Sequence, residues 1–324
     1  MDEAAARVLV LFGPTAVGKT AVSLEVARRL GIPPGHAAAA ERPARAEVIS
    51  ADSRAFFRGL DVVTDKPTHE EREEIPHHLI DCVPIDGAYD AMAFRADAER
   101  IVPEIVERGR VPLIVGGGTL YLGALLRGLF EGPGSDAAFR ATLADRSLEE
   151  LYEELRGVDP QAAGSIHPND RLRIERALEV YRLSGRPISA WQAEAVPSSF
   201  QFVVIGLERE RAEHRRAIAD RVRWMIENGL VEEFERLSAT GLTPDCQAYR
   251  TIGIPETAAY VSGSITLEEM EMRIVSRTWQ LARRQSAWFR QEKHVRWIDV
   301  TGRDAASVAR DIIELWNRTS EAER

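Results

Sequence analysis

Short runs of consecutive apolar residues alternate along this chain with longer segments of helical periodicity. The first run, 8–12, is continuously apolar and stops at a glycine. A continuous apolar run of this length is typical of a strand that is buried on both faces of a parallel sheet. The runs at 48–49, 113–115 and 203–205 also end where a loop should begin, and 295–300 is the candidate for a last strand. Strands that alternate with helices predict a doubly wound α/β fold with a parallel sheet, whose ligands bind beyond the carboxyl ends of the strands.

The middle of the chain has a different pattern. Between about 132 and 199 the runs typical of buried strands disappear, and helical spacing replaces them, as in 147–155 and 171–183. We therefore expect a helical insertion domain at 132–199. It would separate the two parts of one core, 1–131 and 200–324, of which the second ends in C-terminal helices.

Composition narrows the class of protein. A chain of 324 residues with 44% hydrophobic content can bury a large core. The two cysteines, Cys82 and Cys246, are far apart in the sequence and lack the paired spacing of zinc ligands. They indicate neither a disulfide framework nor a structural metal, so we expect a reducing, cytoplasmic setting. The acidic residues within 1–7 do not resemble a signal peptide, and no run approaches the roughly 18 apolar residues of a membrane span. We expect no membrane partner, and a loop without chemistry at 31–46.

Charge is distributed unevenly. The formal net charge of −9 argues mildly against a surface coated with basic groups. Nevertheless, 209–223 contains six arginines against three acids, and 277–296 contains six basic residues against one acid. Each stretch is either the solvated face of a helix or part of a site for a polyanion, and charge alone does not decide between them.

The segment after the first strand fits the phosphate-binding pattern G-x-x-x-x-G-K-[ST] and leads into a helix predicted over 19–30. This strand–loop–helix context favours a P-loop over a chance glycine-rich turn. The loop amides and the helix N-terminus attract phosphate, Lys19 adds a charge, and the Thr20 hydroxyl can ligate Mg²⁺, the cofactor that we expect. Which phosphate compound is bound does not follow. The expected diphosphate- or nucleotide-binding residues are Gly13, Pro14, Thr15, Ala16, Val17, Gly18, Lys19 and Thr20.

An aspartate follows the second predicted strand. Asp52 should face the P-loop across the cleft, because the carboxyl ends of parallel strands share one edge of the sheet. A carboxylate at this place can bind Mg²⁺ through water, position an acceptor hydroxyl, or remove a proton from a nucleophile. The structural alternative is the N-cap of a helix, a role that aspartate favours.

Several motifs, in consistent order, resemble one known family over nearly the whole chain. The most specific are PHHLID (76–81), HPND (167–170) and ARRQ-x-x-WF (282–289). Together with GPTAVGKT, ISADSRAFFRGLDVVTDKPT, FRADA, LIVGGGTLYL and RVRWMIENGLVEEF, they make the chain similar to the tRNA dimethylallyltransferases, also called tRNA isopentenyltransferases. The sequence contains no C-terminal Cys/His zinc finger, which fits the bacterial form.

The resemblance implies a P-loop enzyme that transfers a dimethylallyl group from dimethylallyl diphosphate to N6 of the adenosine at position 37, 3′ of the anticodon, in tRNAs that read codons beginning with U. It implies that Asp52 is the general base on N6 and that Arg221 steadies the diphosphate and the transition state. Lys19 and Thr20, the latter through Mg²⁺, would stabilise charge on the leaving diphosphate. The alternative for Arg221 is a surface charge on a helix. We expect a monomer.

The resemblance also implies contacts with the tRNA anticodon stem-loop. Taking a base out of a single-stranded loop costs only a few kcal/mol, so the adenine can reach Asp52. Arg173 and Arg176, three apart on a predicted helix, can face one ligand together. His167 is expected to structure its loop. The implied tRNA-binding residues are Asp52, Ser53, Arg54, Ala55, Gly118, Arg140, Leu172, Arg173, Ile174, Glu175, Arg176, Arg250, Thr251, Ile252, Gly253, Ile254 and Pro255.

Three positions depart from the family pattern. Gly118 stands where the family has a threonine that lines the channel, and Thr119 comes one residue late. Ile254 replaces the usual tyrosine after Gly253, and the common Gly-Thr-Ala-Lys-Pro appears here with Val63 in place of glycine and Asp65 in place of alanine. None of these positions belongs to the expected catalytic set, so we expect an active enzyme.

Three other functions remain open on the sequence. An adenylate isopentenyltransferase uses the same donor with a free nucleotide, and it resembles the core but needs no extended basic surface. A small-molecule or nucleotide kinase would use the P-loop for ATP. A tRNA-binding protein that has lost catalysis would keep the basic residues, but the intact set of Lys19, Thr20, Asp52 and Arg221 speaks against it.

Overall fold

The computed structural model describes residues 5–30, 45–130 and 132–321. The loop predicted at 31–46 therefore lies outside the described residues, apart from its last two positions. The chain divides into two compact units, a core unit (Met1–Leu122 and Ser199–Arg324) and an insertion unit (Gly123–Ser198). Among the described helices, none is both long enough and apolar enough to span a membrane.

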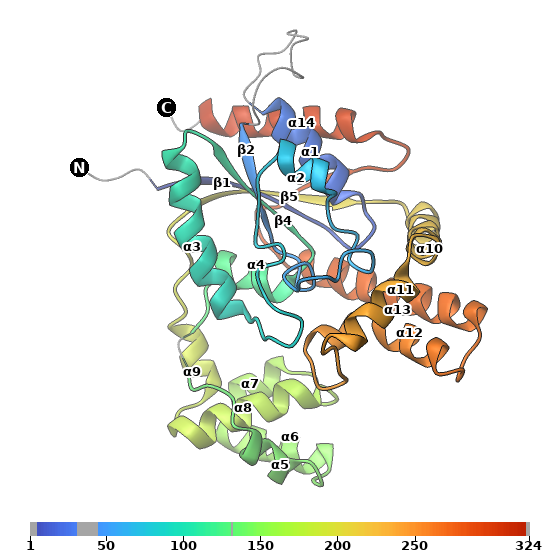
Figure 1. Ribbon diagram of the computed structural model, residues 1–324. Coiled ribbons are helices and arrows are strands. Elements are labelled where there is room, and N and C mark those ends of the chain that lie inside the picture. The colour runs from blue at the N-terminus through green and yellow to red at the C-terminus, as the bar shows by residue number, and fades with distance from the viewer. Residues whose placement is uncertain (1–4, 31–44, 131, 322–324) are drawn as a thin grey trace. The chain divides into compact units, whose positions relative to one another are not determined.

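The described residues of the core unit form a six-stranded sheet in which every strand pairing is parallel, with the order β3-β2-β4-β1-β5-β6 (Figure 1). The predicted doubly wound α/β fold is thus confirmed. The strand that the sequence did not reveal has two residues and no apolar run, and it lies at the edge of the sheet. The strands are β1 (Arg7–Phe12), β2 (Ala46–Ser50), β3 (His77–His78), β4 (Val111–Gly116), β5 (Gln201–Glu208) and β6 (Arg296–Asp299).

Helices cover both faces of this sheet. On one face α1 (Lys19–Arg29) packs against α14 (Ala305–Glu321), and on the other lie α3 (Ala91–Glu107) and α13 (Leu267–Phe289) (Figure 1). The remaining helices that include core-unit residues are α2 (His69–Glu74), α4 (Thr119–Leu126), α10 (Arg211–Glu227), α11 (Leu230–Ala239), the 3₁₀ turn η2 (Ala248–Arg250) and α12 (Ile254–Val261).

Strand β1 shows how one segment serves both layers. Successive side chains of a strand point to opposite faces, so Leu9 and Leu11 join the core formed with α1 and α14. Phe12 points to the other face and stacks on Phe289 of α13, with ring centroids 4.2 Å apart. This stacking anchors α13 beside the carboxyl end of β1, where the P-loop begins.

The insertion unit is helical and has its own core. Leu151, Leu155 and Ile174 are fully buried in it. Its segments begin with strong caps: Ser147 and Glu150 form a capping box, and the Asp170 side chain accepts the Arg173 N–H. Its helices are α5 (Ala137–Leu143), α6 (Leu148–Val158), α7 (Pro160–Ser165), α8 (Arg171–Ser184) and α9 (Ile188–Ala193).

Candidate active site

The P-loop joins the end of β1 to the start of α1. Gly18 caps the helix with φ of 105°, a left-handed conformation that glycine adopts without strain. A Cβ at Gly13 would lie 2.9 Å from the carbonyl oxygen of Leu207, so this turn also requires glycine. The Lys19 ammonium donates to the carbonyl oxygens of Gly13 and Pro14 at 2.9 and 2.8 Å. The lysine therefore lies over the loop, where a phosphate group would compete for its protons.

Two side chains from the second half of the sequence hold this loop from outside. Gln285 of α13 accepts the Thr15 N–H at 2.9 Å and donates to the Gly117 carbonyl at 2.8 Å, so it ties the loop after β1 to the loop after β4. His214 of α10 lies 2.8 Å from the Thr15 carbonyl. Burial lowers the pKa of His214, so the neutral ring donates this bond. Sequence reasoning assigned a role to neither residue.

Two neighbouring cavities meet at the loop. The phosphate cavity, of about 580 Å³, is lined by P-loop residues including Lys19 and Thr20. The arginine cavity, of about 480 Å³, is named for the arginines that line it, which are Arg54, Arg221, Arg250, Arg277 and Arg284. Among the described residues that line the arginine cavity, Asp52 is the one acid. The residues common to both cavities are Thr15, Asp52, Thr64 and Arg221.

Asp52 lies at the junction of the two cavities, directly after β2. Its Oδ1 accepts the backbone N–H of Arg54 at 2.8 Å, and the described segment 51–68 contains no helix. The aspartate thus stabilises a turn, and the alternative of a helix N-cap is not what the structure shows. No hydrogen bond within the described part of the chain occupies Oδ2, which leaves this oxygen able to accept a proton from a ligand.

The other expected catalytic residues surround Asp52. Arg221 of α10 has a side chain that is 23% exposed, and it donates to the Thr64 carbonyl at 2.9 Å, with Nε 3.7 Å from Asp65. It is therefore a residue of the site and not a surface charge. Burial lowers the pKa of Lys19 to about 8, with Asp52 opposing the shift and Arg221 adding to it. The two cations and the carboxylate thus act on one another at short range.

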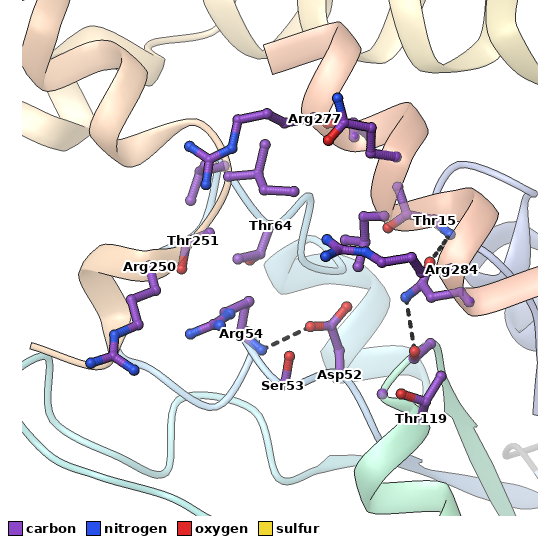
Figure 2. Close-up of a pocket in the computed structure, with 18 of the residues that line it drawn as sticks. Thr15, Asp52, Ser53, Arg54, Thr64, Thr119, Arg250, Thr251, Arg277 and Arg284 are labelled. Carbon is purple, nitrogen blue, oxygen red and sulfur yellow. Dashed lines mark hydrogen bonds between the residues drawn. The ribbon is translucent and has the colours of Figure 1, made fainter. Parts of the chain in front are cut away.

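The structure explains two of the three departures from the family pattern. A Cβ at Gly118 would lie 2.5 Å from the carbonyl oxygen of Ala51, so the backbone here excludes a threonine at 118. Thr119, the first residue of α4, lines the arginine cavity, and Figure 2 shows it near Asp52. Asp65 adopts φ of 54° and lines the phosphate cavity beside Arg221, where it supplies the carboxylate of the ion pair.

The expected tRNA-binding residues of the core unit divide into two groups. Those that line the arginine cavity are Asp52, Ser53, Arg54, Gly118, Arg250, Thr251 and Ile252. Those that do not are Ala55, Gly253, Ile254 and Pro255. Ile254 is fully buried, and a Cβ at Gly253, where φ is 109°, would lie 2.6 Å from Val63. Gly253 and Ile254 therefore shape the fold next to the cavity and do not offer side chains to a ligand.

In the insertion unit, the expected tRNA-contacting arginines differ from one another. Arg140 donates two hydrogen bonds to the fully buried Glu179, both at 2.8 Å, and Arg176 donates a third at 2.6 Å. The Arg173 side chain, by contrast, is 68% exposed, and it forms a longer ion pair with Asp170, in which Nε lies 3.4 Å from Oδ2. The expectation that Arg173 and Arg176 face one ligand together is corrected here, because Arg176 is turned toward Glu179.

The neighbours of these arginines on α8 also differ in burial. Leu172 is 77% exposed, whereas Ile174 is fully buried in the core of the insertion unit. Glu175 forms an ion pair with Arg171 at 2.7 Å. Of the side chains expected to contact tRNA on α8, Leu172 and Arg173 are therefore the ones presented to solvent.

Helix α13 supplies cavity residues that sequence reasoning left undecided. Arg277, Gln280 and Arg284 all line the arginine cavity, and Figure 2 shows Arg277 and Arg284 on α13 at its wall. Arg277 and Arg284 are seven residues apart, which is two helical turns, so they share one face. That spacing was present in the sequence, but it could not show which partner the face meets.

Comparisons with known proteins agree over most of the chain. The family described as IPP transferase matches residues 55–292. The chain is 39% identical over 312 residues to a tRNA dimethylallyltransferase of Thermotoga maritima, covering 95% of this chain and 97% of that protein. It is 38% identical over 316 residues to tRNA dimethylallyltransferase 2 of Geotalea uraniireducens, covering 96% and 97%.

Solved structures give the same result. The full-length tRNA isopentenylpyrophosphate transferase of Bacillus halodurans superposes with a TM-score of 0.69 at 34% identity, covering 98% of this chain and 99% of that one. A eukaryotic dimethylallyltransferase acting on tRNA superposes with a TM-score of 0.73 at 26% identity, covering 91% and 74%.

Proposed function

We propose that this chain, which belongs to the IPP transferase family, transfers a dimethylallyl group from dimethylallyl diphosphate to N6 of adenosine 37 in tRNAs that read codons beginning with U. The observation that carries the proposal is the pairing of the two cavities. One is built on a P-loop and suits a diphosphate, and the other places five arginines around one carboxylate and suits a polyanion. Asp52 lies where a donor in the first and an acceptor in the second would meet.

The donor diphosphate is held by the P-loop amides, Lys19 and Arg221. As the bond between the prenyl C1 and oxygen breaks, the electron pair leaves with the diphosphate, and these cations stabilise the growing negative charge. Mg²⁺, when bound, would neutralise part of this charge. Thr20 lines the phosphate cavity, and the described residues contain no cluster of three His, Cys, Asp or Glu. A hydroxyl together with the diphosphate oxygens suits Mg²⁺, which keeps several of its waters.

Asp52 acts on the acceptor. The N6 amine of adenine is a poor nucleophile because its lone pair is delocalised into the ring. As the bond between N6 and C1 forms, Asp52 accepts the N6 proton at Oδ2, while Oδ1 stays bonded to the Arg54 amide. Holding one carboxylate oxygen in this way fixes the orientation of the other.

The arginine cavity receives the anticodon loop of the tRNA. A base in a single-stranded loop leaves its stack at low cost, and the arginines pair with phosphates near it. The relatives that match are named for tRNA, so the alternative of a free nucleotide acceptor has no support from them. We expect the enzyme to act as a monomer in the cytoplasm.

The test is to incubate the protein with unmodified tRNA, Mg²⁺ and labelled dimethylallyl diphosphate, with adenosine monophosphate and ATP as competing acceptors. Label in tRNA alone supports the proposal, and a tRNA with guanosine at position 37 should stay unlabelled. Label in the mononucleotide would instead indicate an adenylate isopentenyltransferase. tRNA binding without any transfer would indicate a binding protein that has lost catalysis.

A further inference from the structure

Glu233 of α11 is a buried carboxylate that the proposed chemistry does not use. It is 1% exposed and lines neither the phosphate cavity nor the arginine cavity. Within the described part of the chain it forms no ion pair, and burial raises its pKa against the effect of its hydrogen bonds. Burying a carboxylate without a cationic partner costs free energy, which its hydrogen bonds must offset. The groups that bond to Glu233 therefore indicate its structural role.

All three of those bonds go to one loop. The Glu233 carboxylate accepts the consecutive backbone N–H groups of Asp61, Val62 and Val63, at 2.8, 2.7 and 3.0 Å. These residues are about 170 positions away in the sequence, so the contact fixes a long-range packing of the loop on α11. A carboxylate that binds three amides holds their positions much more tightly than one neutral bond would.

The fixed amides set the position of the next residues in the chain. Asp65 N–H donates to the Val62 carbonyl and Lys66 N–H to the Asp61 carbonyl, both at 3.1 Å. The 61–66 loop is therefore one compact turn. Thr64, between the two ends of this turn, presents its carbonyl to Arg221 at 2.9 Å, and Asp65 places its carboxylate 3.7 Å from the same guanidinium.

We propose that Glu233 is a positioning residue for Arg221: it holds the 61–66 loop, and the loop holds the guanidinium at the junction of the two cavities. The inference rests on the proposed function, in which Arg221 stabilises the departing diphosphate. A shift of about 1 Å in a group that acts on the transition state can reduce a rate by about 10²-fold, even when the substituted residue that causes the shift touches nothing in the reaction. Glu233 thus acts through Arg221 and does not contact the substrate.

The test is a double-mutant cycle. Glu233→Gln keeps the size of the side chain but places an NH₂ group against the loop amides, and Glu235→Gln, an exposed glutamate on the same helix, is the matched control. We expect Glu233→Gln to lower the single-turnover transfer rate about 10- to 100-fold, with the KM for tRNA within about twofold of the parent. In an Arg221→Ala background the same substitution should lower the rate by less than about twofold.

Several outcomes would overturn the inference. The first is a Glu233→Gln rate equal to that of Glu235→Gln, and the second is an effect on the KM for tRNA alone. The third is a Glu233→Gln rate loss that is as large in the Arg221→Ala background as in the parent, so that the two rate losses multiply. A purely structural role would give the multiplying pattern, because lost stability does not depend on Arg221. If Glu233→Gln does not fold, Glu233→Asp, which keeps the charge and shortens the reach, takes its place in the same cycle with an intermediate effect expected.

A second readout separates this inference from the proposed function. The affinity for inorganic pyrophosphate, measured without tRNA by calorimetry, should fall in Glu233→Gln and not fall further when Arg221→Ala is already present. If the parent protein binds pyrophosphate but labels no tRNA, the proposed function fails while the cycle on pyrophosphate affinity still decides the role of Glu233. If the parent does not bind pyrophosphate, the proposed function and the positioning role of Glu233 both fail.

Discussion

Three of the five arginines that line the arginine cavity and two arginines of the insertion unit are used in opposite ways; the other two cavity arginines, Arg221 and Arg277, pair with Asp65 and Glu256. Around the arginine cavity, Arg54, Arg250 and Arg284 form no ion pair within the described chain, and Asp52 is the one acid that lines the cavity there. In the insertion unit, Arg140 and Arg176 both donate to the buried Glu179. The first arrangement keeps positive charge available for a ligand, whereas the second neutralises it to stabilise the fold.

The comparison shows why counting basic residues does not locate a site. An arginine that is bonded to a buried carboxylate has already lost much of its electrostatic attraction for a phosphate. The same residue type lining a cavity with a single acid adds to the potential that a polyanion meets. Five predictions test this difference, beginning with the one that should have the largest effect.

Substitutions of Asp52 and Glu179 should differ most clearly, in their effects on transfer rate and on stability. Asp52→Asn keeps the shape and the bond to the Arg54 amide but cannot take up a proton, so we expect single-turnover transfer to fall by at least about 10²-fold. Binding of tRNA and donor should remain close to that of the parent, and the melting temperature should change by only a few degrees. Transfer at the rate of the parent would remove the general-base role and leave Asp52 with its turn alone.

Glu179→Gln should show the reverse pattern. Removing the charge weakens the bonds from two partly exposed arginines, and we expect a loss of about 1.5–3 kcal/mol in the free energy of unfolding. The transfer rate per folded molecule should stay within about threefold of the parent. Urea unfolding alongside the transfer assay measures both. A large loss of rate with unchanged stability would place Glu179 in the catalytic machinery and would contradict the view that its arginines serve stability.

The pH dependence of the Glu179 cluster gives a check on the same substitution. Burial by itself would raise the pKa of Glu179, but the bonds from Arg140 and Arg176 outweigh it and hold the pKa at about 2. A depressed carboxylate pKa contributes stability above its unfolded value, and this contribution is lost as the pH falls toward 2. The unfolding free energy of Glu179→Gln should therefore change less between pH 5 and about 2 than that of the parent.

Lys19 should make donor binding depend on pH in the alkaline range. Its pKa of about 8 means that the ammonium is present below this pH and is lost above it. Because a diphosphate binds the charged form, the affinity for pyrophosphate should fall by up to about tenfold for each pH unit above 8. Calorimetry at several pH values measures this, with Lys19→Arg, which stays charged, as the control. A flat profile in the parent would show that Lys19 does not bind the diphosphate in its titrating form.

The smallest effect should come from the exposed arginine of the insertion unit. Arg173→Ala should raise the KM for tRNA a few-fold and reduce the slope of log affinity against log salt by about 0.7, as one lost phosphate contact does. Arg176→Ala should instead lower the stability of the protein, because it removes a bond to Glu179, and should leave the salt slope close to that of the parent. If the two variants give equal salt slopes and equal stabilities, the distinction between available and neutralised arginines fails in this unit.

Much of the fold could be predicted because its signals are local. The apolar run at 8–12, the glycines of the P-loop and the helix that follows are neighbours in the sequence, and the structure places them as β1, loop and α1. The two-residue strand β3 escaped prediction because it carries no apolar run of its own. Pairing with β2 alone makes it a strand.

A P-loop and its flanking elements are consecutive in the chain, so the amino-acid sequence is enough to predict the phosphate chemistry and the family. Which charges are available depends on contacts that form only in the folded chain. Gln285 meets Thr15 across 270 positions, Glu233 meets Val62 across 171, and Arg140 meets Glu179 across 39. The strength of such a contact depends on burial and on the partner that packing brings within about 3 Å, and neither is encoded in any short stretch of sequence.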